Sequence, residues 1–405
     1  MNFLKSRKIK ENIFLILIFL SLLISSFNII NNFFEKVVFG DRQVFGDFMV
    51  YRCGAISFIN NINPYEANAL SKCFNTLGNS LDYFYPPHTL KIFSFFSNIS
   101  LSNSIILWAL IIIPIFMCQV LMIKKIFFKE TNLILVFTIY LFSFGGLNFT
   151  GLLTGNITVL MYSLLSISFY YSIIKKNTIP LFIILTLMCL FKITYLVFFI
   201  LIFLISKKKF FTNTLISLST IIIFYLFSYF NDPNLFIDFL NHLTYLRSNE
   251  FYNLYGGGFG LYSIIKEIPE YYFPELSNTY KIIFQIAWFS VCGLFILSIF
   301  YLFIDNKSFS KTHILAIALL IITICYPLIK DYEGFLLVAV IYYLILNINW
   351  KFFLQDTKKI KYLLFFLTFS IHDKYMLILI SMIIYLSILY LDYKKKKVFI
   401  NNENF

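Results

Sequence analysis

Charged residues are scarce in this sequence: Asp, Glu, Lys and Arg make up 13% of its 405 residues, while 60% are hydrophobic. A typical soluble domain carries about a quarter charged residues. The apolar residues also form runs about as long as a bilayer is thick. The composition therefore excludes an ordinary soluble domain and predicts an all-α polytopic membrane protein.

Signatures of metal and nucleotide sites are lacking as well. The chain has no CxxC pair and no Cys/His spacing of the kind that binds zinc. The stretch GGGFG at 256–260 follows no predicted strand and precedes no GK[ST], which excludes a P-loop or dinucleotide site. We interpret it as a flexible loop near the membrane. The sequence predicts no cofactor and no metal ligands, and it leaves open whether a metal ion is required.

The formal net charge of +13 is concentrated where apolar runs end. The cationic clusters are Lys5–Lys10, Lys124–Lys125, Lys175–Lys176, Lys207–Lys209 and Lys394–Lys397. Clusters at such junctions follow the positive-inside pattern, in which cations stay on the cytoplasmic side. No basic face lies away from these junctions, so we expect no nucleic-acid partner.

The apolar runs predict about twelve transmembrane helices in a single integral membrane domain over residues 1–405. The predicted helices are 13–30, 104–123, 132–148, 156–174, 178–191, 193–206, 210–230, 281–304, 313–329, 334–349, 361–371 and 375–391. No small-x-small cleavage site follows the first run, which favours a retained anchor over a signal peptide. With the N-terminus inside, every cationic cluster falls on the cytoplasmic side. We therefore expect a multi-pass protein of the plasma membrane with both termini cytoplasmic.

Three polar interruptions fall on the outer side in this topology. Lys192 interrupts 178–206, KDYE (330–333) interrupts 313–349, and HDK (372–374) interrupts 361–391. Charged residues at such places either face a protein-lined cavity or simply form a tight turn. For HDK the turn is favoured, whereas for Lys192 both interpretations stay open.

Two long segments are predicted to lie outside: outer loop one (31–103) and outer loop two (231–280). Together they make about 120 residues, which is too long for simple connectors. Their aromatic residues favour interfacial helices along the membrane surface. Cys53 and Cys73 share loop one and would pair if that loop faces an oxidising compartment. The other four cysteines lie in apolar runs, where they serve as small hydrophobic residues.

Residues 44–61 have the pattern of an amphipathic helix ended by Asn63-Pro64. Its polar stripe contains Asp47, Tyr51, Gly54, Ser57 and Asn61. The stripe offers a carboxylate as a candidate base and a glycine that would allow close approach of a ligand. A solvated polar face of an interfacial helix would show the same pattern.

Two further stretches predict helix starts. Pro86-Pro87 suits the first turn of a helix, which would bring His88 and Lys91 near an N-terminus suited to a phosphate. A purely structural histidine explains the same pattern equally well. Asn156 follows Gly155 at the outer start of a predicted span, where an N-cap is the simplest role.

The order of these motifs resembles glycosyltransferase family 87 of the C-type membrane glycosyltransferases. The resemblance rests on the Asp-bearing helix, NPY (63–65), FYPP (84–87), GN (155–156) and FK (191–192), and runs weakly through residues 14–349. It implies a multi-helix fold and a sugar donor carried on polyprenyl phosphate. It also implies Asp47 as the catalytic base, with Asp41 as the alternative base, and Lys192 as a phosphate contact.

One late motif departs from this family. Where a P-x-x-W-x-H step is expected, the chain has YPLIKDYEG (326–334), with Pro327 in place but Lys330-Asp331 where a histidine would stand. The donor phosphate is then held differently, or the correspondence at this step is incorrect.

The residues suit transfer from a phosphate leaving group. Cations near the phosphate stabilise the departing charge, and a base accepts the proton of the acceptor hydroxyl. The predicted donor-binding set is Arg52, Tyr51, His88, Lys192, Lys330 and Asp331. The predicted function is inverting transfer of a hexose, with mannose as one candidate, to a lipid or glycan acceptor at the outer face.

Two other classes remain as alternatives. A multi-span transporter predicts repeated halves and helices broken near mid-membrane. No internal repeat is visible in the sequence. A polysaccharide polymerase or ligase would share the lipid-linked donor but use a large outer loop with arginines and a histidine, for which only Arg52 and Arg247 stand out.

Overall fold

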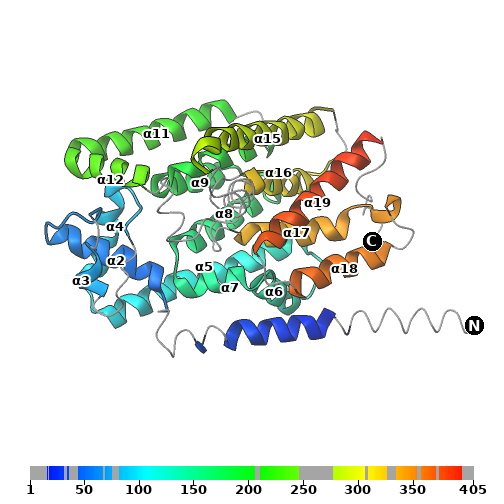
Figure 1. Ribbon diagram of the computed structural model, residues 1–405, viewed down its shortest axis with the longest axis horizontal. Helices are drawn as coiled ribbons and strands as arrows, with labels where there is room; N and C mark the ends of the chain where they lie inside the picture. The colour runs from blue at the N-terminus through cyan, green and yellow to red at the C-terminus, as the bar shows by residue number, and fades with distance from the viewer. Residues whose placement is uncertain are drawn as a thin grey trace, which may run out of the picture. The chain divides into compact units, whose positions relative to one another are not determined.

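The computed structural model describes most of the chain. The described residues are 16, 18–31, 34–35, 44–66, 69–74, 82–205, 210–245, 277–305, 309–325, 334–353, 357–370 and 374–394. Every regular element within these ranges is a helix, as Figure 1 shows. The prediction of an all-α fold is confirmed.

The chain divides into two compact units. We call residues 42–122 and 151–257 the loop-one unit, and residues 1–41, 123–150 and 258–405 the C-terminal unit. Every sequence-predicted site residue within the described ranges belongs to the loop-one unit.

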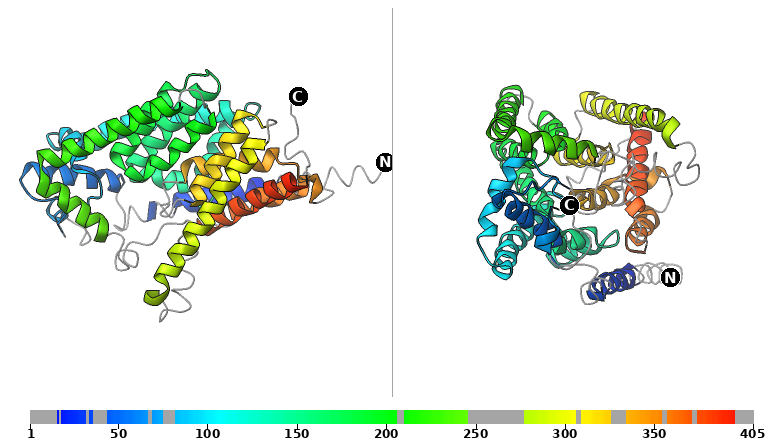
Figure 2. Two further views of the ribbon diagram at one scale, coloured as in Figure 1. Left: turned by 90° about the horizontal axis from the view of Figure 1, so that it is seen from above. Right: turned by 60° about the vertical axis from the view of Figure 1, so that its left-hand side comes forward.

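The loop-one unit joins the helices of the first outer segment to a group of apolar helices. Its helices are α2 (Gly46–Ile59), α3 (Ser71–Phe74), α4 (Pro87–Ser97), most of α5 (Leu101–Phe127), α8 (Ile157–Ile173), α9 (Ile179–Phe191), η1 (Ile193–Phe198), α10 (Phe199–Ile205), α11 (Phe210–Asn231) and α12 (Pro233–Tyr245). Helix α2 packs against α4, and α9 packs between α8 and α11 (Figures 1 and 2). Helix α12 contacts both α11 and α4, so it links the α2–α4 pair to the group formed by α8, α9 and α11.

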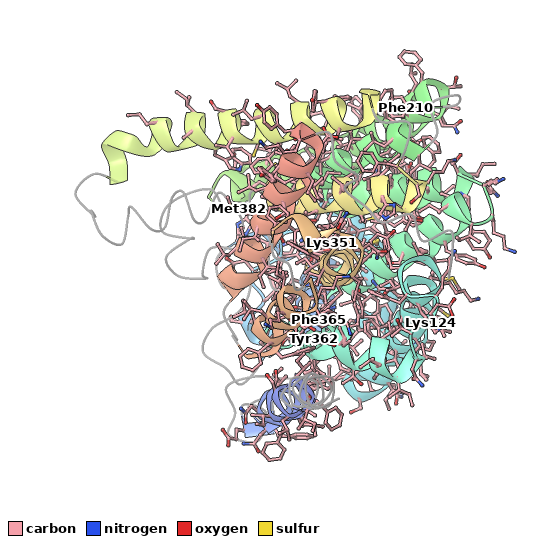
Figure 3. All side chains as sticks on the ribbon, turned by 90° about the vertical axis from the view of Figure 1, so that its right-hand side faces the viewer. Lys124, Phe210, Lys351, Tyr362, Phe365 and Met382 are labelled. Atoms are coloured by element: carbon pink, nitrogen blue, oxygen red, sulfur yellow. A yellow bond between two sulfur atoms is a disulfide. The ribbon has the colours of Figure 1, made fainter. Side chains whose placement is uncertain are left out.

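The C-terminal unit is centred on α16. Besides an apolar helix over Ile18–Asn31, its helices are α6 (Leu133–Phe142), α15 (Ser277–Asp305), α16 (Lys311–Cys325), α17 (Phe335–Asn347), η4 (Trp350–Phe352), α18 (Thr357–Ser370) and α19 (Lys374–Tyr393). Helix α16 contacts α15, α17 and α19 and is almost wholly buried from Leu315 to Cys325. Figure 3 labels Phe365 on α18 and Met382 on α19, two helices that pack against each other.

Local sequence signals account for several helix boundaries. The side chains of Asn132 and Asn156 cap α6 and α8 by accepting hydrogen bonds from backbone N–H groups two residues further on. Pro87 begins α4, as its fixed φ favours. Lys192, with an extended backbone, ends α9. The predicted N-cap at Asn156, the helix start at Pro87 and the break at Lys192 are therefore confirmed.

One predicted helix is wrong. Residues 132–148 do not form one span, because α6 ends at Phe142 and α7 (Leu147–Thr154) leaves it at a bend of 80°. Phe144, Gly145 and Gly146 between them all have positive φ, a conformation that an α-helix cannot contain. The backbone N–H of Phe144 donates instead to the carbonyl of Thr368 on α18 at 2.9 Å.

Two described helices, α5 and α11, are long and apolar enough to cross a membrane, and the bent pair α6–α7 makes a third if it forms one span. Eight shorter apolar helices lie in the described ranges, at places where the hydrophobic runs predicted them. The chain thus has the helices of a membrane protein, while the count of twelve spans stays a prediction.

Candidate functional site

Asp47 lies in the first turn of α2, where it is half-buried. The helix begins after Phe45, whose backbone is left-handed with φ 61° and whose N–H donates to the carbonyl of Leu153 at 2.8 Å. A helix N-terminus stabilises negative charge, since its first N–H groups have no partner within the helix. The turn at Phe45 therefore holds a carboxylate at a place that favours its charged form.

Asn156 connects Asp47 to the start of α8. Its Oδ1 accepts from the N–H of Thr158 at 2.9 Å, and its Nδ2 donates to Oδ2 of Asp47 at 3.1 Å. Asn156 is 2% exposed, so its bond to Thr158 is buried, while its bond to the half-buried Asp47 is partly buried. One buried amide thus caps a helix and orients the carboxylate of another.

Gly155 allows this close approach. Its φ of +67° suits glycine, and a Cβ there would lie 2.3 Å from the ring of Phe45. Its carbonyl accepts from the indole N–H of Trp108 at 2.8 Å. The GN motif therefore brings the starts of α2 and α8 together.

Two tyrosines extend the network away from Asp47. The hydroxyls of Tyr51 and Tyr85 are 3.1 Å apart, and the Tyr51 hydroxyl accepts from the N–H of Ile157 at 3.0 Å. Burial raises the pKa of Tyr51 well above its usual value, and nearby Tyr85 and Asp47 raise it further. Tyr51 is therefore a neutral hydrogen-bonding group rather than a base.

Lys192 approaches Tyr85 from the break between α9 and η1. Its Nζ lies 6.0 Å from the ring centroid of Tyr85 and 6.0 Å from that of Tyr195, the outer limit of a cation–π contact. The side chain is half-buried. For Lys192, this placement favours a charged side chain that faces protein groups over a residue that merely forms a tight turn.

The network thus joins a carboxylate and a cation from distant parts of the chain. Asn156 binds Asp47, and the N–H of the next residue, Ile157, donates to Tyr51. Tyr51 in turn bonds to Tyr85, whose ring lies 6.0 Å from the Nζ of Lys192. Asp47, Tyr51 and Lys192 were predicted from the sequence. The contact between Asn156 and Asp47 and the role of Tyr85 were not. The motifs GN and FYPP already contained both residues, although nothing local in them reveals the partners.

The middle of the predicted polar stripe of α2 packs against protein, while Asp47 at its start is half-buried and Asn61 at its end is exposed. Tyr51, Gly54 and Ser57 are buried, and a Cβ at Gly54 would lie 2.5 Å from the ring of Tyr83. The interpretation of this stripe as a solvated polar face is therefore wrong for its three middle residues, while the interfacial position of the helix stays a prediction. Gly54 allows close packing of Tyr83, which leaves no space there for a ligand.

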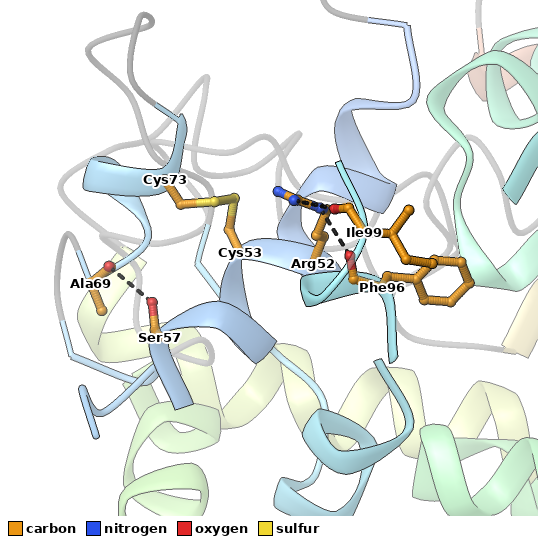
Figure 4. The surroundings of a disulfide bond; sticks show 7 residues. All are labelled: Arg52, Cys53, Ser57, Ala69, Cys73, Phe96 and Ile99. Carbon is orange, nitrogen blue, oxygen red and sulfur yellow. Dashed lines mark hydrogen bonds between the residues drawn. A yellow bond between two sulfur atoms is a disulfide. The ribbon is translucent and has the colours of Figure 1, made fainter. Parts of the chain in front are cut away.

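Arg52 is held at the opposite end of α4 from His88. Its Nε donates to the carbonyl of Phe96 at 3.2 Å and its Nη2 to that of Ile99 at 2.9 Å (Figure 4). Partial burial lowers its pKa from the ordinary value. A cation at the C-terminal end of a helix stabilises the unpaired carbonyls there. Arg52 therefore orients α4 against α2 and lies outside the Asp47 network.

Cys53 and Cys73 form a disulfide that fastens α3 to α2 (Figure 4). Ser57 adds a hydrogen bond to the carbonyl of Ala69 at 3.3 Å. The conditional pairing of these cysteines is confirmed. Because disulfides persist in oxidising compartments, the bond agrees with an outward position of loop one.

His88 lies in the first turn of α4, as predicted. Its Nε2 lies 2.6 Å from the carbonyl of Leu190, which fixes the proton on Nε2, since a carbonyl only accepts. Burial lowers the pKa of His88, with the Leu190 bond opposing this shift. His88 is therefore a neutral link between α4 and α9 at physiological pH, while Lys91 is exposed.

Several predicted site residues lie outside the described residues: Asp41, Arg247, Lys330, Asp331 and the GGGFG stretch. Within the described part of the chain, no group of three or more His, Cys, Asp or Glu side chains is placed to hold a metal ion.

Comparison with known proteins adds no relative. No protein-family model, no curated protein and no solved structure matches this chain.

Proposed function

We propose that the protein is a membrane glycosyltransferase that moves a hexose from a polyprenyl-phosphate donor to a lipid or glycan acceptor at the outer face of the plasma membrane. The observation that carries this proposal is a chain of contacts that has Asp47 at one end and Lys192 at the other. It runs from Asp47 through the start of α8, Asn156 and Ile157, to the tyrosine pair Tyr51 and Tyr85 beside Lys192. The reaction requires a base for the acceptor and a cation for the donor phosphate. Asp47, fixed by Asn156, is the candidate base, and Lys192 is the candidate cation.

The roles follow from the chemistry of the donor. The phosphate of the carrier leaves with its negative charge, which a nearby cation stabilises, so Lys192 is assigned to the donor phosphate. The acceptor hydroxyl loses a proton as it attacks the sugar, so Asp47 is assigned as the base. A single displacement inverts the anomeric centre. Arg52 and His88 bind backbone carbonyls and are left out of the donor site.

The orientation is supported by the charge pattern and by the disulfide. The cationic clusters predict that loop one is outside, and the Cys53–Cys73 bond suits an oxidising side. Labelling of introduced cysteines tests this assignment, because the free cysteines other than Cys118 are buried. An impermeant maleimide should label Lys91→Cys in intact cells and Lys175→Cys only after permeabilisation, in a Cys118→Ser background. The reverse pattern would contradict the topology.

Membranes bearing Asp47→Asn test the reaction itself, with Asp41→Asn at matched expression as the comparison. The readout is loss of a radiolabelled sugar from a panel of polyprenyl-phosphate donors. We expect loss of transfer in Asp47→Asn alone. Full activity of this variant would remove the assignment of the base, and an inactive wild type across the panel would remove the proposed function.

A transporter is the second candidate, because discontinuous helices are typical of that class. The 80° bend between α6 and α7 and the extended residue Lys192 are two such breaks. A transporter would move a lipid-linked or soluble sugar across vesicle membranes without breaking its bond to the carrier. Chemical analysis of the carrier after incubation separates these two functions.

A further inference from the structure

Trp108 on α5 contacts both segments that carry the Asp47–Asn156 pair. On one side, its ring stacks on the ring of Phe48 on α2, with centroids 5.1 Å apart and an interplanar angle of 18°. On the other side, its indole N–H donates to the carbonyl of Gly155 at 2.8 Å. Phe48 directly follows Asp47 in the chain. Gly155 directly precedes Asn156, so one buried side chain joins the two segments next to their paired residues.

The hydrogen bond to Gly155 holds the peptide from which Asn156 projects. The carbonyl of Gly155 and the N–H of Asn156 belong to one planar peptide group. Gly155 has a φ of +67°, and glycine allows backbone rotations that other residues resist. The indole N–H restrains this rotation by a buried bond. The direction of the Asn156 side chain, whose Nδ2 lies 3.1 Å from Oδ2 of Asp47, is therefore set partly by Trp108.

The ring stack on Phe48 holds the first turn of α2 against α5. Phe96 of α4 makes an edge contact with Phe48, with 5.2 Å between ring centroids. Phe96 also makes an edge contact with Trp108 at 5.7 Å. Stacked and edge-on ring pairs have preferred geometries, so three rings in mutual contact leave Phe48 little freedom. The aromatic cluster therefore fixes the backbone beside Asp47.

We propose that Trp108 is a positioning residue that sets the distance between Asp47 and Asn156, through its stack on α2 and its hydrogen bond to Gly155. This inference rests on the proposed function only in taking Asp47 as the base. Trp108 is buried, so it acts through the two backbone segments rather than by contact with a substrate. The amide of Asn156 stabilises the charged form of Asp47, so loss of the positioning should make this carboxylate easier to protonate.

Two substitutions at position 108 remove the indole donor. Trp108→Phe keeps an aromatic ring but loses volume. Replacement of Trp108 by 3-benzothienyl-alanine keeps the bicyclic shape and has sulfur in place of the N–H, so it removes the hydrogen bond without leaving a cavity. Trp350→Phe is the matched control, because the indole N–H of Trp350 also donates to a carbonyl, that of Ile345, at 2.8 Å. Trp108 and Trp350 are each 3% exposed, but Trp350 belongs to the C-terminal unit.

Labelling of Asp47 by a hydrophobic carbodiimide gives a readout that needs no sugar transfer. Carbodiimides react with the protonated carboxyl group, so the pH dependence of labelling, followed by mass spectrometry, reports where Asp47 is protonated. Both substitutions of Trp108 should move the midpoint to higher pH by about one unit, which increases labelling roughly tenfold at a fixed pH above the midpoint. Trp350→Phe should keep the wild-type midpoint. An unchanged midpoint in the benzothienyl variant would overturn the proposal.

A double variant tests whether Trp108 acts through Asn156. Asn156→Ser removes the donor to Asp47 directly, so Trp108→Phe should change the labelling by no more than roughly twofold once Asn156→Ser is present. Additive shifts of the midpoint would show that Trp108 affects Asp47 independently of Asn156, and this result would overturn the proposal.

Sugar transfer separates this inference from the proposed function. The benzothienyl variant should have a lower kcat with little change in KM, and the acid limb of its pH–rate profile should move together with the labelling midpoint. A midpoint shift in a protein whose wild type transfers no sugar would retain the positioning role of Trp108 and remove the glycosyltransferase. Transfer by the wild type with the same profile in the benzothienyl variant would retain the enzyme and remove the role of Trp108.

Discussion

The side-chain amide of Asn156 donates a hydrogen bond to the carboxylate of Asp47 at 3.1 Å, although the two residues are 109 positions apart. The same amide caps α8 through its Oδ1. Asn156 therefore has two roles, capping of α8 and orientation of the Asp47 carboxylate. Substitutions that keep the cap but remove the bond to Asp47 separate these two roles experimentally.

Asn156→Asp should preserve the fold but impair activity. Aspartate caps helices about as well as asparagine, so the thermal midpoint in detergent should change little. The substitution removes the donor to Asp47 and puts a second carboxylate beside it, and like charges disfavour joint ionisation. The acid limb of the pH–rate profile should therefore move to higher pH.

Asn156→Ser is the control for this prediction, since serine caps the helix without adding a charge. It should lower the rate and move the acid limb to higher pH by less than Asn156→Asp does, because it removes the donor to Asp47 without adding a charge. An unchanged profile in Asn156→Asp would contradict the role of Asp47 as a base.

Gly54→Ala should destabilise the protein by about 1–3 kcal/mol, the usual cost of overpacking a core. The added Cβ would lie 2.5 Å from the buried ring of Tyr83, which must then move. Gly46→Ala in the same helix meets no atom within 4 Å and should be neutral or stabilising by up to about 1 kcal/mol. Thermal unfolding in detergent distinguishes them, and equal midpoints for both variants would refute the packing role of Gly54.

Local patterns were sufficient for much of the fold. The apolar runs located the helices, the predicted helix 44–61 is observed as Gly46–Ile59, and Asn156 caps α8 as its residue type favours. These features depend on residues close in sequence. The break after Phe142 could also have been recognised, because Gly145-Gly146 is a strong turn signal inside an apolar run.

Contacts between segments that lie far apart in the sequence could not be predicted from local patterns. The buried face of α2 is determined by α4 and Tyr83, which the spacing of its own polar residues does not reveal. Arg52 and His88 were predicted to bind phosphate because of their residue types and positions. In the structure, both donate hydrogen bonds to backbone carbonyls of other segments. Only the folded chain shows that Asp47 and Lys192 belong to one network through Tyr85.

Removal of the Cys53–Cys73 disulfide should cost about 3 kcal/mol, because it closes a loop of 20 residues in the unfolded chain. The double variant Cys53→Ser/Cys73→Ser should melt at a lower temperature than the wild type. A reducing agent should lower the wild-type midpoint toward that of the variant and leave the variant unchanged. Cys118→Ser, which removes an exposed free thiol, should keep the full response to reduction. A wild type that does not respond would contradict the disulfide.

His88 should make the protein less stable in mild acid. Burial lowers its pKa in the folded state from the ordinary 6.5, and its bond to the Leu190 carbonyl only partly opposes this shift. As the pH decreases below 6.5, His88 is protonated in the unfolded chain but stays neutral in the folded chain. The free energy of unfolding therefore decreases as the pH is lowered, until the pKa of His88 in the folded state is reached.

His88→Gln can keep a donor to Leu190 but cannot be protonated, so its thermal midpoint should fall less steeply between about pH 7 and about pH 5. Some slope should remain, because burial also lowers the pKa of His242. Equal slopes in variant and wild type would show that His88 titrates alike in both states. A steeper wild-type slope would instead support the assignment of His88 as a neutral link between α4 and α9, outside the charge that binds the donor.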